Sequence, residues 1–341
     1  MDYHRQINGP FAPADAQKDT RMPLRFTVLA SGSSGNASLL EADGFGLLID
    51  AGLGPRQLAA RLAEIGSSWT CIHAAILTHT HGDHWNERTL AFLHRRRLPL
   101  YCHPNHHDAL SEWSDVFALM HSGGLVRPYK HAETLIFATG LCCHPIAIRH
   151  DGGATFGFRF EGRAPDGASW ALAYLTDLGS WTAELAERLA DVDVLALEFN
   201  HDVALQYASG RSPRLIARVL GDAGHLSNEQ AAEFLREILN RSEPGRLRHV
   251  VQLHLSQDCN RPELALMAAR QSLEGCGHEV EVHASDQYRP GPSLIVEPKI
   301  VSCRRSADPR LRSIITESIQ LWLPGWDNQP TTSGRRDRVT R

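Results

Sequence analysis

The chain has 341 residues, of which 42% are hydrophobic, and a formal net charge of −4 at pH 7. This length is enough for one domain with a full core. The sequence contains no apolar run of about 18 residues, so no membrane span is predicted. The net charge excludes a broadly basic nucleic-acid binder. The seven cysteines are odd in number and lack C-x-x-C spacing, which favours reduced thiols in a cytoplasmic protein over a disulfide framework or a zinc ribbon.

The N-terminal part begins with a segment that has no apolar pattern. Residues 1–23 mix charged residues with proline and glutamine, so we expect a disordered leader and no secretory signal. A strand is expected at residues 26–30. It leads into residues 31–36, which are rich in glycine and serine and predict a turn, or alternatively a loop whose backbone N–H groups hold a phosphate. A strand at 46–49 and a helix at 58–65 follow.

The densest group of polar residues comes directly after the apolar segment 74–77. The sequence Thr-His-Thr-His-Gly-Asp-His places three histidines and one aspartate within six residues. Imidazole and carboxylate together are ligands for zinc and similar divalent metals. A loop that follows a strand can direct His79 and His81 at one ion and Asp83 and His84 at a second. A histidine-rich surface loop is the alternative, which the spacing behind a buried strand disfavours.

The rest of the chain continues the alternation of strands and helices. Three more apolar segments, each expected to be a strand, end at His150, Asp177 and His254. A Ser-x-x-Gln capping box begins at Ser227. Helices are predicted at residues 90–93, 183–190, 231–239 and 262–274. Strands and helices in two halves predict two sheets covered by helices on both outer faces.

The metal motif and the strand ends that follow it resemble the signature of the metallo-β-lactamase superfamily. Members of that superfamily are αββα sandwiches with one or two metal ions at an edge of the sandwich. The resemblance implies an α/β fold of this type, with a hydrolase domain at residues 24–300. Residues 301–341 would then be a C-terminal appendage, partly disordered because of its arginine, serine and proline content.

The resemblance also implies a role for each strand-end residue. His150 would complete the ligands of the first metal, and His254 those of the second. Asp177 would bridge the two metals, and Asp50 would orient the ligating histidines from behind the metal loop. The expected cofactors are two divalent metal ions, zinc or manganese. Their expected ligands are His79, His81, Asp83, His84, His150, Asp177 and His254.

Two further segments narrow the class of enzyme. Glu198 in the sequence Leu-Glu-Phe-Asn-His-Asp and His225 in Gly-His-Leu-Ser-Asn resemble the acid/base elements of phosphodiesterase members such as ribonuclease Z. Lactamases and glyoxalase II enzymes do not normally carry this pair. We expect His225 to protonate the leaving oxygen, Glu198 or a neighbour to hold it, and Asp83 to orient the attacking hydroxide as the third catalytic residue. The alternative is that His225 is a structural residue at the start of a helix, where Ser227 forms the N-cap.

Together with residues 29–36, these segments resemble the YycJ/WalJ-like metallohydrolases, a bacterial group associated with exonuclease activity on DNA. The resemblance covers roughly residues 24–297 and departs at Cys259, where members often carry asparagine. The intervals on either side of Asp177 are too short for the extra domain of β-CASP nucleases or the tRNA-gripping arm of ribonuclease Z.

The resemblance therefore implies a dinuclear metal-dependent phosphodiesterase, an exonuclease-like nuclease acting on DNA or RNA. One alternative is a small-molecule cyclic phosphodiesterase with the same metal site. Another is a regulatory protein that retains the metal site without catalysis, which the complete ligand set argues against. We expect a nucleic-acid substrate and no membrane association, while the metal, the strand polarity and the choice between DNA and RNA stay open.

Overall fold

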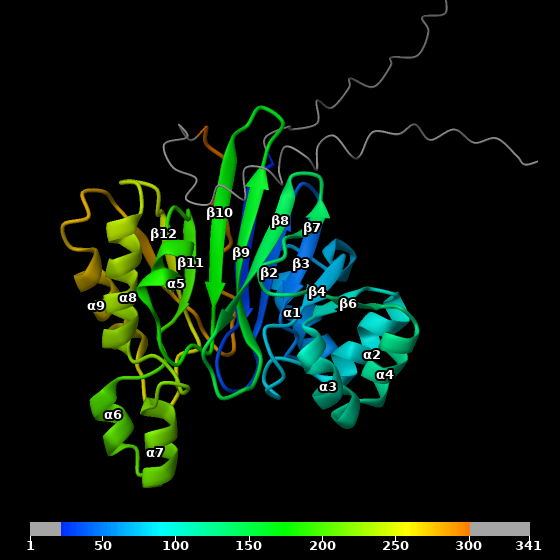
Figure 1. The fold of residues 1–341 in the computed structure, drawn as a ribbon, viewed down its shortest axis with the longest axis horizontal. Helices are drawn as coiled ribbons and strands as arrows, with labels where there is room; N and C mark the ends of the chain where they lie inside the picture. Colours follow the sequence, from blue (N-terminus) through cyan, green and yellow to red (C-terminus); the bar gives the residue numbers. More distant parts are fainter. Residues whose placement is uncertain (1–21, 301–341) are drawn as a thin grey trace, which may run out of the picture. The chain divides into compact units, whose positions relative to one another are not determined.

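The computed structural model describes residues 22–300. Two seven-stranded sheets pack face to face, and helices cover the outer face of each sheet (Figure 1). The described residues therefore form the expected αββα sandwich. Within residues 22–300, no helix is long and apolar enough to cross a membrane.

The first sheet has the strand order β14-β1-β2-β3-β4-β5-β6. It is antiparallel from β14 to β3 and parallel from β3 to β6. Its strands are β1 (Leu24–Ala30), β2 (Ala37–Ala42), β3 (Phe45–Ile49), β4 (Ala74–Ile76), β5 (Leu100–Cys102), β6 (Val126–Pro128) and β14 (Leu294–Val296). The helices of this half are α1 (Pro55–Glu64), α2 (Glu87–Arg96), α3 (His107–Trp113) and α4 (Asp115–Ser122), with short 3₁₀ turns at Trp69–Cys71 and Pro104–His106.

The second sheet has the strand order β13-β12-β11-β10-β9-β8-β7. It is antiparallel from β7 to β10 and parallel from β10 to β13. Its strands are β7 (Leu135–Ala138), β8 (Leu141–Ile148), β9 (Thr155–Arg163), β10 (Ser169–Leu175), β11 (Val194–Glu198), β12 (His249–Leu253) and β13 (Glu281–Ala284). The helices of this half are α5 (Ala183–Arg188), α6 (Val203–Ala208), α7 (Pro213–Leu220), α8 (Asn228–Arg241) and α9 (Pro262–Leu273).

The core is divided by the sheets because successive strand residues face opposite sides. In β3, Leu47 and Ile49 pack in the core between the sheets, whereas Leu48 packs against the helices of the first half. In β10, Tyr174 faces the space between the sheets and Ala173 faces the helices of the second half. Both central strands are therefore buried on both faces, which explains why they read as continuous apolar runs.

The predicted capping box is confirmed at the start of α8. The Gln230 backbone N–H donates to Ser227 Oγ at 3.2 Å, and the Ser227 N–H donates to Gln230 Oε1 at 2.9 Å. This reciprocal pair satisfies donors that a helix start leaves without intrahelical partners. Proline opens α9 at Pro262, as the sequence predicts.

Met22 lies near the end of the expected leader. Met22 is buried against Ala164 and Ala168, and its carbonyl oxygen accepts a hydrogen bond of 2.9 Å from Trp170 Nε1. Met22 therefore packs with the folded domain, although the expected leader extends to residue 23. The rest of the leader and the appendage predicted at 301–341 lie outside the described residues.

The segment at residues 31–36 is a turn, closed by a hydrogen bond of 3.1 Å from the Gly35 N–H to the Gly32 carbonyl. Most backbone donors of this segment are already used, which disfavours the alternative of a phosphate-holding loop. The Gly32 N–H donates to Asn36 Oδ1 at 2.8 Å, and the Ser34 N–H donates to Gln287 Oε1 at 2.9 Å. The segment therefore serves to hold Asn36 and neighbouring backbone in place.

Candidate metal centre

Most of the predicted site residues lie at the carboxyl ends of parallel strands, whereas His150 follows the antiparallel strand β8 and His225 lies between α7 and α8. Asp50 follows β3, and the histidine-rich loop follows β4, which pairs with β3 in parallel. In the second sheet, Asp177 follows β10 and His254 follows β12, with Glu198 ending the strand between them. Because parallel neighbours end at the same sheet edge, residues far apart in the sequence meet there.

One group of donor atoms comes from His79, His81, His150 and Asp177, whose ligand atoms all lie within 4.8 Å of one another. His150 Nε2 lies 3.3 Å from His81 Nδ1 and 3.6 Å from Asp177 Oδ1. His79 Nε2 is buried and has no hydrogen-bond partner among the described residues. Three imidazoles and a carboxylate oxygen thus converge on one point, as the resemblance implies for the first metal.

A second group comes from Asp83, His84 and His254, whose ligand atoms also lie within 4.8 Å of one another. His254 Nε2 lies 3.4 Å from Asp83 Oδ2, and His84 Nε2 lies 3.6 Å from the same oxygen. Asp177 contacts both groups, with Oδ1 toward His150 and Oδ2 at 3.1 Å from His84 Nε2. Its two oxygens therefore face different donor groups.

Buried acceptors fix which nitrogen His84 and His150 present to the site. Asp50 Oδ2 lies 2.7 Å from His84 Nδ1, and Asp50 Oδ1 accepts the Thr78 backbone N–H at 2.8 Å. The Gly224 carbonyl accepts from His150 Nδ1 at 3.0 Å. A proton held at Nδ1 leaves the Nε2 lone pair available to a metal. From the sequence we expect Asp50 to orient the ligating histidines, and in the structure Asp50 contacts His84 and Thr78.

Glu198 and His225 are brought together beside the two donor groups. His225 Nδ1 donates to Glu198 Oε1 at 2.9 Å, and Oε1 also lies 3.0 Å from His254 Nδ1. The other oxygen of Glu198 accepts the backbone N–H groups of Leu178 and Leu226 at 2.9 and 3.2 Å. Burial alone would raise the pKa of Glu198, but His225 and His254 together outweigh it and hold the pKa at about 2. Glu198 is thus an ionised residue that positions two imidazoles.

The cluster fits divalent metal ions. Nε2 of His254, like that of His79, is buried without a hydrogen-bond partner among the described residues, and buried polar atoms are normally paired. Burial would raise the pKa of Asp177, yet His254 and His84 hold it well below its usual range. Burial would lower the pKa of His254, yet Asp177, Asp83 and Glu198 raise it to about 10. Buried carboxylates therefore demand positive charge here, which a metal supplies.

The structure adds residues to the site that the sequence did not single out. Asn36 Nδ2 lies 3.0 Å from His84 Nε2 and 3.2 Å from Asp83 Oδ2. Ser31 Oγ accepts the backbone N–H of His254 at 2.8 Å. Both belong to the turn that the sequence predicted, but their contacts join residues far apart in the chain, and the contact between Ser31 and His254 also joins the two sheets.

Comparison with known proteins places the chain among hydrolases of this fold. A sequence model described as "Beta-lactamase superfamily domain" matches residues 46–243. The chain is 28% identical over 282 residues to exodeoxyribonuclease YycJ of Bacillus anthracis, covering 79% of this chain and 98% of that protein. It is 32% identical over 249 residues to exodeoxyribonuclease WalJ of Streptococcus pneumoniae serotype 2 (strain D39), covering 72% of this chain and 86% of that protein.

Solved structures show the same fold at lower identity. A diphosphatase from the PhnP family matches with a TM-score of 0.54 and 21% identity, covering 82% of this chain and 99% of that one. Zinc-bound PqqB from Methylobacterium extorquens matches with a TM-score of 0.56 and 19% identity, covering 79% of this chain and 99% of that one. These two matches bear on the fold alone.

Proposed function

Since the chain belongs to the metallo-β-lactamase superfamily, in its YycJ/WalJ-like group, we propose that it hydrolyses phosphodiester bonds of DNA or RNA in an exonuclease-like manner, with two divalent metal ions. Membership makes the protein a metal-dependent hydrolase. The polynucleotide substrate and the number of ions are the proposal. The names of its relatives, both exodeoxyribonucleases, support the substrate.

The two donor groups support a pair of ions, zinc or manganese. His79, His81 and His150 would hold one ion, and Asp177 would contribute to both. Asp83, His84 and His254 would hold the other. When bound, such a pair supplies Lewis-acid chemistry: it lowers the pKa of a water and neutralises the charge that develops on the phosphate.

The observation that carries the proposal is the hydrogen bond between His225 and Glu198. A carboxylate at His225 Nδ1 keeps that nitrogen protonated and directs the opposite nitrogen away from Glu198. The His225 side chain is 18% exposed, and its ring centroid lies 5.0 Å from that of His150 and 5.1 Å from that of His254. An imidazole that touches both donor groups and still reaches solvent can donate a proton to a leaving oxygen.

Asp83 would act in the attack of water, whereas His225 acts in the departure of the leaving oxygen. Its side chain is 20% exposed, in contrast to the fully buried Asp50. The carboxylate can therefore accept a hydrogen bond from the attacking water and orient it, while the Asn36 amide contacts the same carboxylate oxygen at 3.2 Å and restrains it.

The proposal is tested by substituting the proton donor. We expect His225→Ala to keep its metal and fold but to lose turnover on an oligonucleotide by roughly 10²–10⁴-fold. A nitrophenyl diester has a good leaving group that needs less protonation, so its hydrolysis should fall less. Metal content and both rates are measured on the same preparation, with His94→Ala, on the outer helix α2, as the matched control.

Each other outcome has a distinct meaning. Loss of metal from His225→Ala would make His225 a ligand. Equal losses on both substrates with full metal would remove the general-acid role. A loss of activity that only follows a loss of thermal stability would leave His225 as a structural residue at the start of α8.

A further inference from the structure

A second group of metal-ligating side chains lies on the last two strands of the second sheet. His249 opens β12, and Glu281 and His283 lie on β13. The parallel register pairs His249 with Glu281 and Val251 with His283. Because alternate residues of a strand share a face, all three side chains lie on the face that Val251 turns to the core between the sheets.

The distances within this group suit a shared ligand. Glu281 Oε2 lies 3.5 Å from His249 Nδ1 and 3.4 Å from His283 Nε2. Neighbouring donors around a tetrahedral zinc ion lie roughly 3.4 Å apart, given bonds of about 2.0–2.2 Å. A direct N–H···O hydrogen bond is shorter, about 2.7–3.2 Å. The carboxylate is therefore too far for a strong hydrogen bond to either ring and well placed to share an ion with both.

The two facing nitrogens lack any other partner. His249 Nδ1 and His283 Nε2 are both buried and make no hydrogen bond within residues 22–300. Leaving two such atoms unsatisfied is costly, and a native structure normally pairs them. Burial also lowers the pKa of His249, which favours the neutral imidazole that binds metals. A cation between the rings would satisfy both lone pairs.

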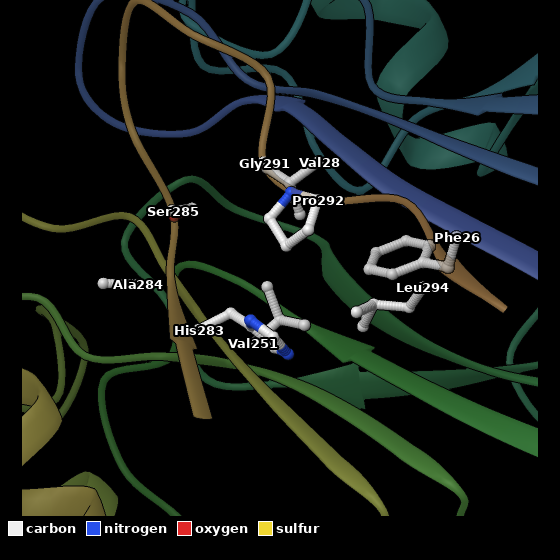
Figure 2. A pocket seen from close by; sticks show the side chains of 9 residues that line it. All are labelled: Phe26, Val28, Val251, His283, Ala284, Ser285, Gly291, Pro292 and Leu294. Atoms are coloured by element: carbon white, nitrogen blue, oxygen red, sulfur yellow. The ribbon is translucent and has the colours of Figure 1, made fainter. Parts of the chain in front are cut away.

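The surroundings of His283 offer no substitute partner. His283 lines a small pocket between the sheets (Figure 2). Figure 2 shows its imidazole directed toward Val251, with Phe26 and Leu294 of the opposite sheet on the far wall. None of these three side chains can accept or donate a hydrogen bond. The Ser285 hydroxyl, which also lines the pocket, donates to the Gln252 carbonyl, so Glu281, at 3.4 Å, is the polar side chain that faces the imidazole.

A comparable group on β8 and β9 shows a cluster whose donors are already used. Cys142, His144 and Glu161 also bring ligand atoms within 4.8 Å. There, however, Arg159 Nε donates to Glu161 at 2.7 Å, and Thr134 Oγ1 lies 3.1 Å from His144 Nδ1. Burial raises the pKa of Cys142 to about 12, which disfavours the thiolate that a metal requires. The donors of that group therefore already have partners and do not require an ion.

We propose that His249, Glu281 and His283 bind a divalent transition-metal ion. Two imidazoles and one carboxylate are a known ligand set for zinc. The site is separate from the metal centre, because His249 opens β12 and His254 follows its other end, roughly 15 Å away by the rise of a strand. An ion here would tie the edge strand β13 to β12 and so stabilise an exposed sheet edge.

The test is a zinc titration of chelator-treated protein against a chromogenic competing chelator. Glu281→Gln removes the charged donor from a side chain that is 61% exposed, so the fold should be kept. Glu279→Gln, an exposed glutamate two residues away, makes the same charge change and is the control. We expect Glu281→Gln to bind one zinc equivalent fewer than the parent, or that equivalent at least tenfold more weakly, while Glu279→Gln matches the parent.

A double variant, His249→Ala with His283→Ala, extends the test. It should lose the same equivalent, and its melting temperature should no longer rise with the last equivalent of zinc. Hydrolysis of a nitrophenyl diester by Glu281→Gln should stay at the parental rate, which separates this site from the proposed active site. Parental zinc number and affinity in Glu281→Gln would overturn the proposal, and so would loss of zinc together with loss of diester hydrolysis.

Discussion

At the scale of single residues, three members of the site have an unusual backbone conformation. Asp50, Asp177 and His254 have φ values of 59°, 56° and 54°, in the left-handed region that residues other than glycine rarely adopt. Each such residue costs about 1–3 kcal/mol, which the surrounding structure must offset. Asp50 and His254 directly follow a strand and Asp177 comes two residues after one, so the turn in the chain places their side chains in the cluster. Strain concentrated in one site supports a functional role for these residues.

Gly152 provides a test of how tightly the histidines are packed. A Cβ atom at this position would lie 2.6 Å from His79 Cδ2, and 3.1 Å from both His150 Cδ2 and His81 Cε1. These contacts are far closer than van der Waals distance, so alanine should displace the imidazoles without removing one. We expect Gly152→Ala to weaken metal binding by tenfold or more, measured by titration with a competing chelator.

The control for this variant lies in the metal loop itself. Gly82 has nothing within 4 Å of the position of an added Cβ, so Gly82→Ala should bind metal as the parent does. Parental metal affinity in Gly152→Ala would show that the histidines are not held as closely as the structure places them.

At the scale of elements, the sequence predicted the parts with strong local patterns. Residues 46–49, 171–175 and 250–253 are mainly apolar runs, and they became parts of β3, β10 and β12. The edge strands β6 and β13 are short and mix apolar with charged or polar residues, so they form no apolar run that the sequence would reveal. They exist because neighbouring strands pair with them, which is information from tertiary structure.

The site shows the same division between local and long-range information. Four of the seven expected ligands were recognisable as one dense motif, and His150, Asp177 and His254 because each ends an apolar run; the structure brings all seven together in two adjoining groups. The contacts of Asn36 with His84 and of Asp151 with Arg218 were not predictable, because they join residues far apart in the sequence and show no local spacing. The roles of the ligands as metal-binding residues stay predictions until metal is measured.

The helices α6 and α7 give a prediction at this scale. Figure 1 shows them beyond the sheets, at the end toward which β10 points. Arg218 of α7 pairs with Asp151, whose Oδ1 lies 3.9 Å from His81 Nε2, so this pair of helices borders the metal centre. Arg214 on α7 is exposed. If the substrate is a nucleic acid, this arginine is available to its phosphates.

We therefore expect Arg214→Ala to weaken oligonucleotide binding and to reduce the slope of log affinity against log salt concentration by about 1. Hydrolysis of a small nitrophenyl diester, which does not reach α7, should not change. Arg270→Ala, an exposed arginine near the end of α9, is the matched control. Equal salt slopes for the parent and Arg214→Ala would place the nucleic acid elsewhere.

At the scale of the whole molecule, the site depends on both halves of the sandwich. The histidine-rich loop follows a strand of the first sheet, whereas Asp177 and His254 follow strands of the second. The hydrogen bond from the His254 N–H to Ser31 Oγ joins the two halves directly at the site. Neither half could assemble the donor groups alone, so metal binding should depend on the folded sandwich and stabilise it.

The boundary of the domain can be tested by truncation. Residues 1–21 contain no motif and no periodic apolar face, so their removal should leave the melting temperature and diester hydrolysis unchanged. Met22→Ala in the shortened chain should lower stability by about 2 kcal/mol, because it exposes a buried side chain. Thermal and urea unfolding measure both effects. A large fall in melting temperature from the truncation itself would show that the leader packs on the domain.

The central claim is that the protein is a metal-dependent nuclease. The most direct test uses single- and double-stranded oligonucleotides labelled at either the 5′ or the 3′ end. They are incubated with the full chain before and after metal removal. The predicted result is progressive shortening of at least one strand type from one end, lost on chelation and restored by zinc or manganese. Hydrolysis of a cyclic or nitrophenyl diester, with every strand left intact in the presence of metal, would contradict the claim and identify a small-molecule phosphodiesterase.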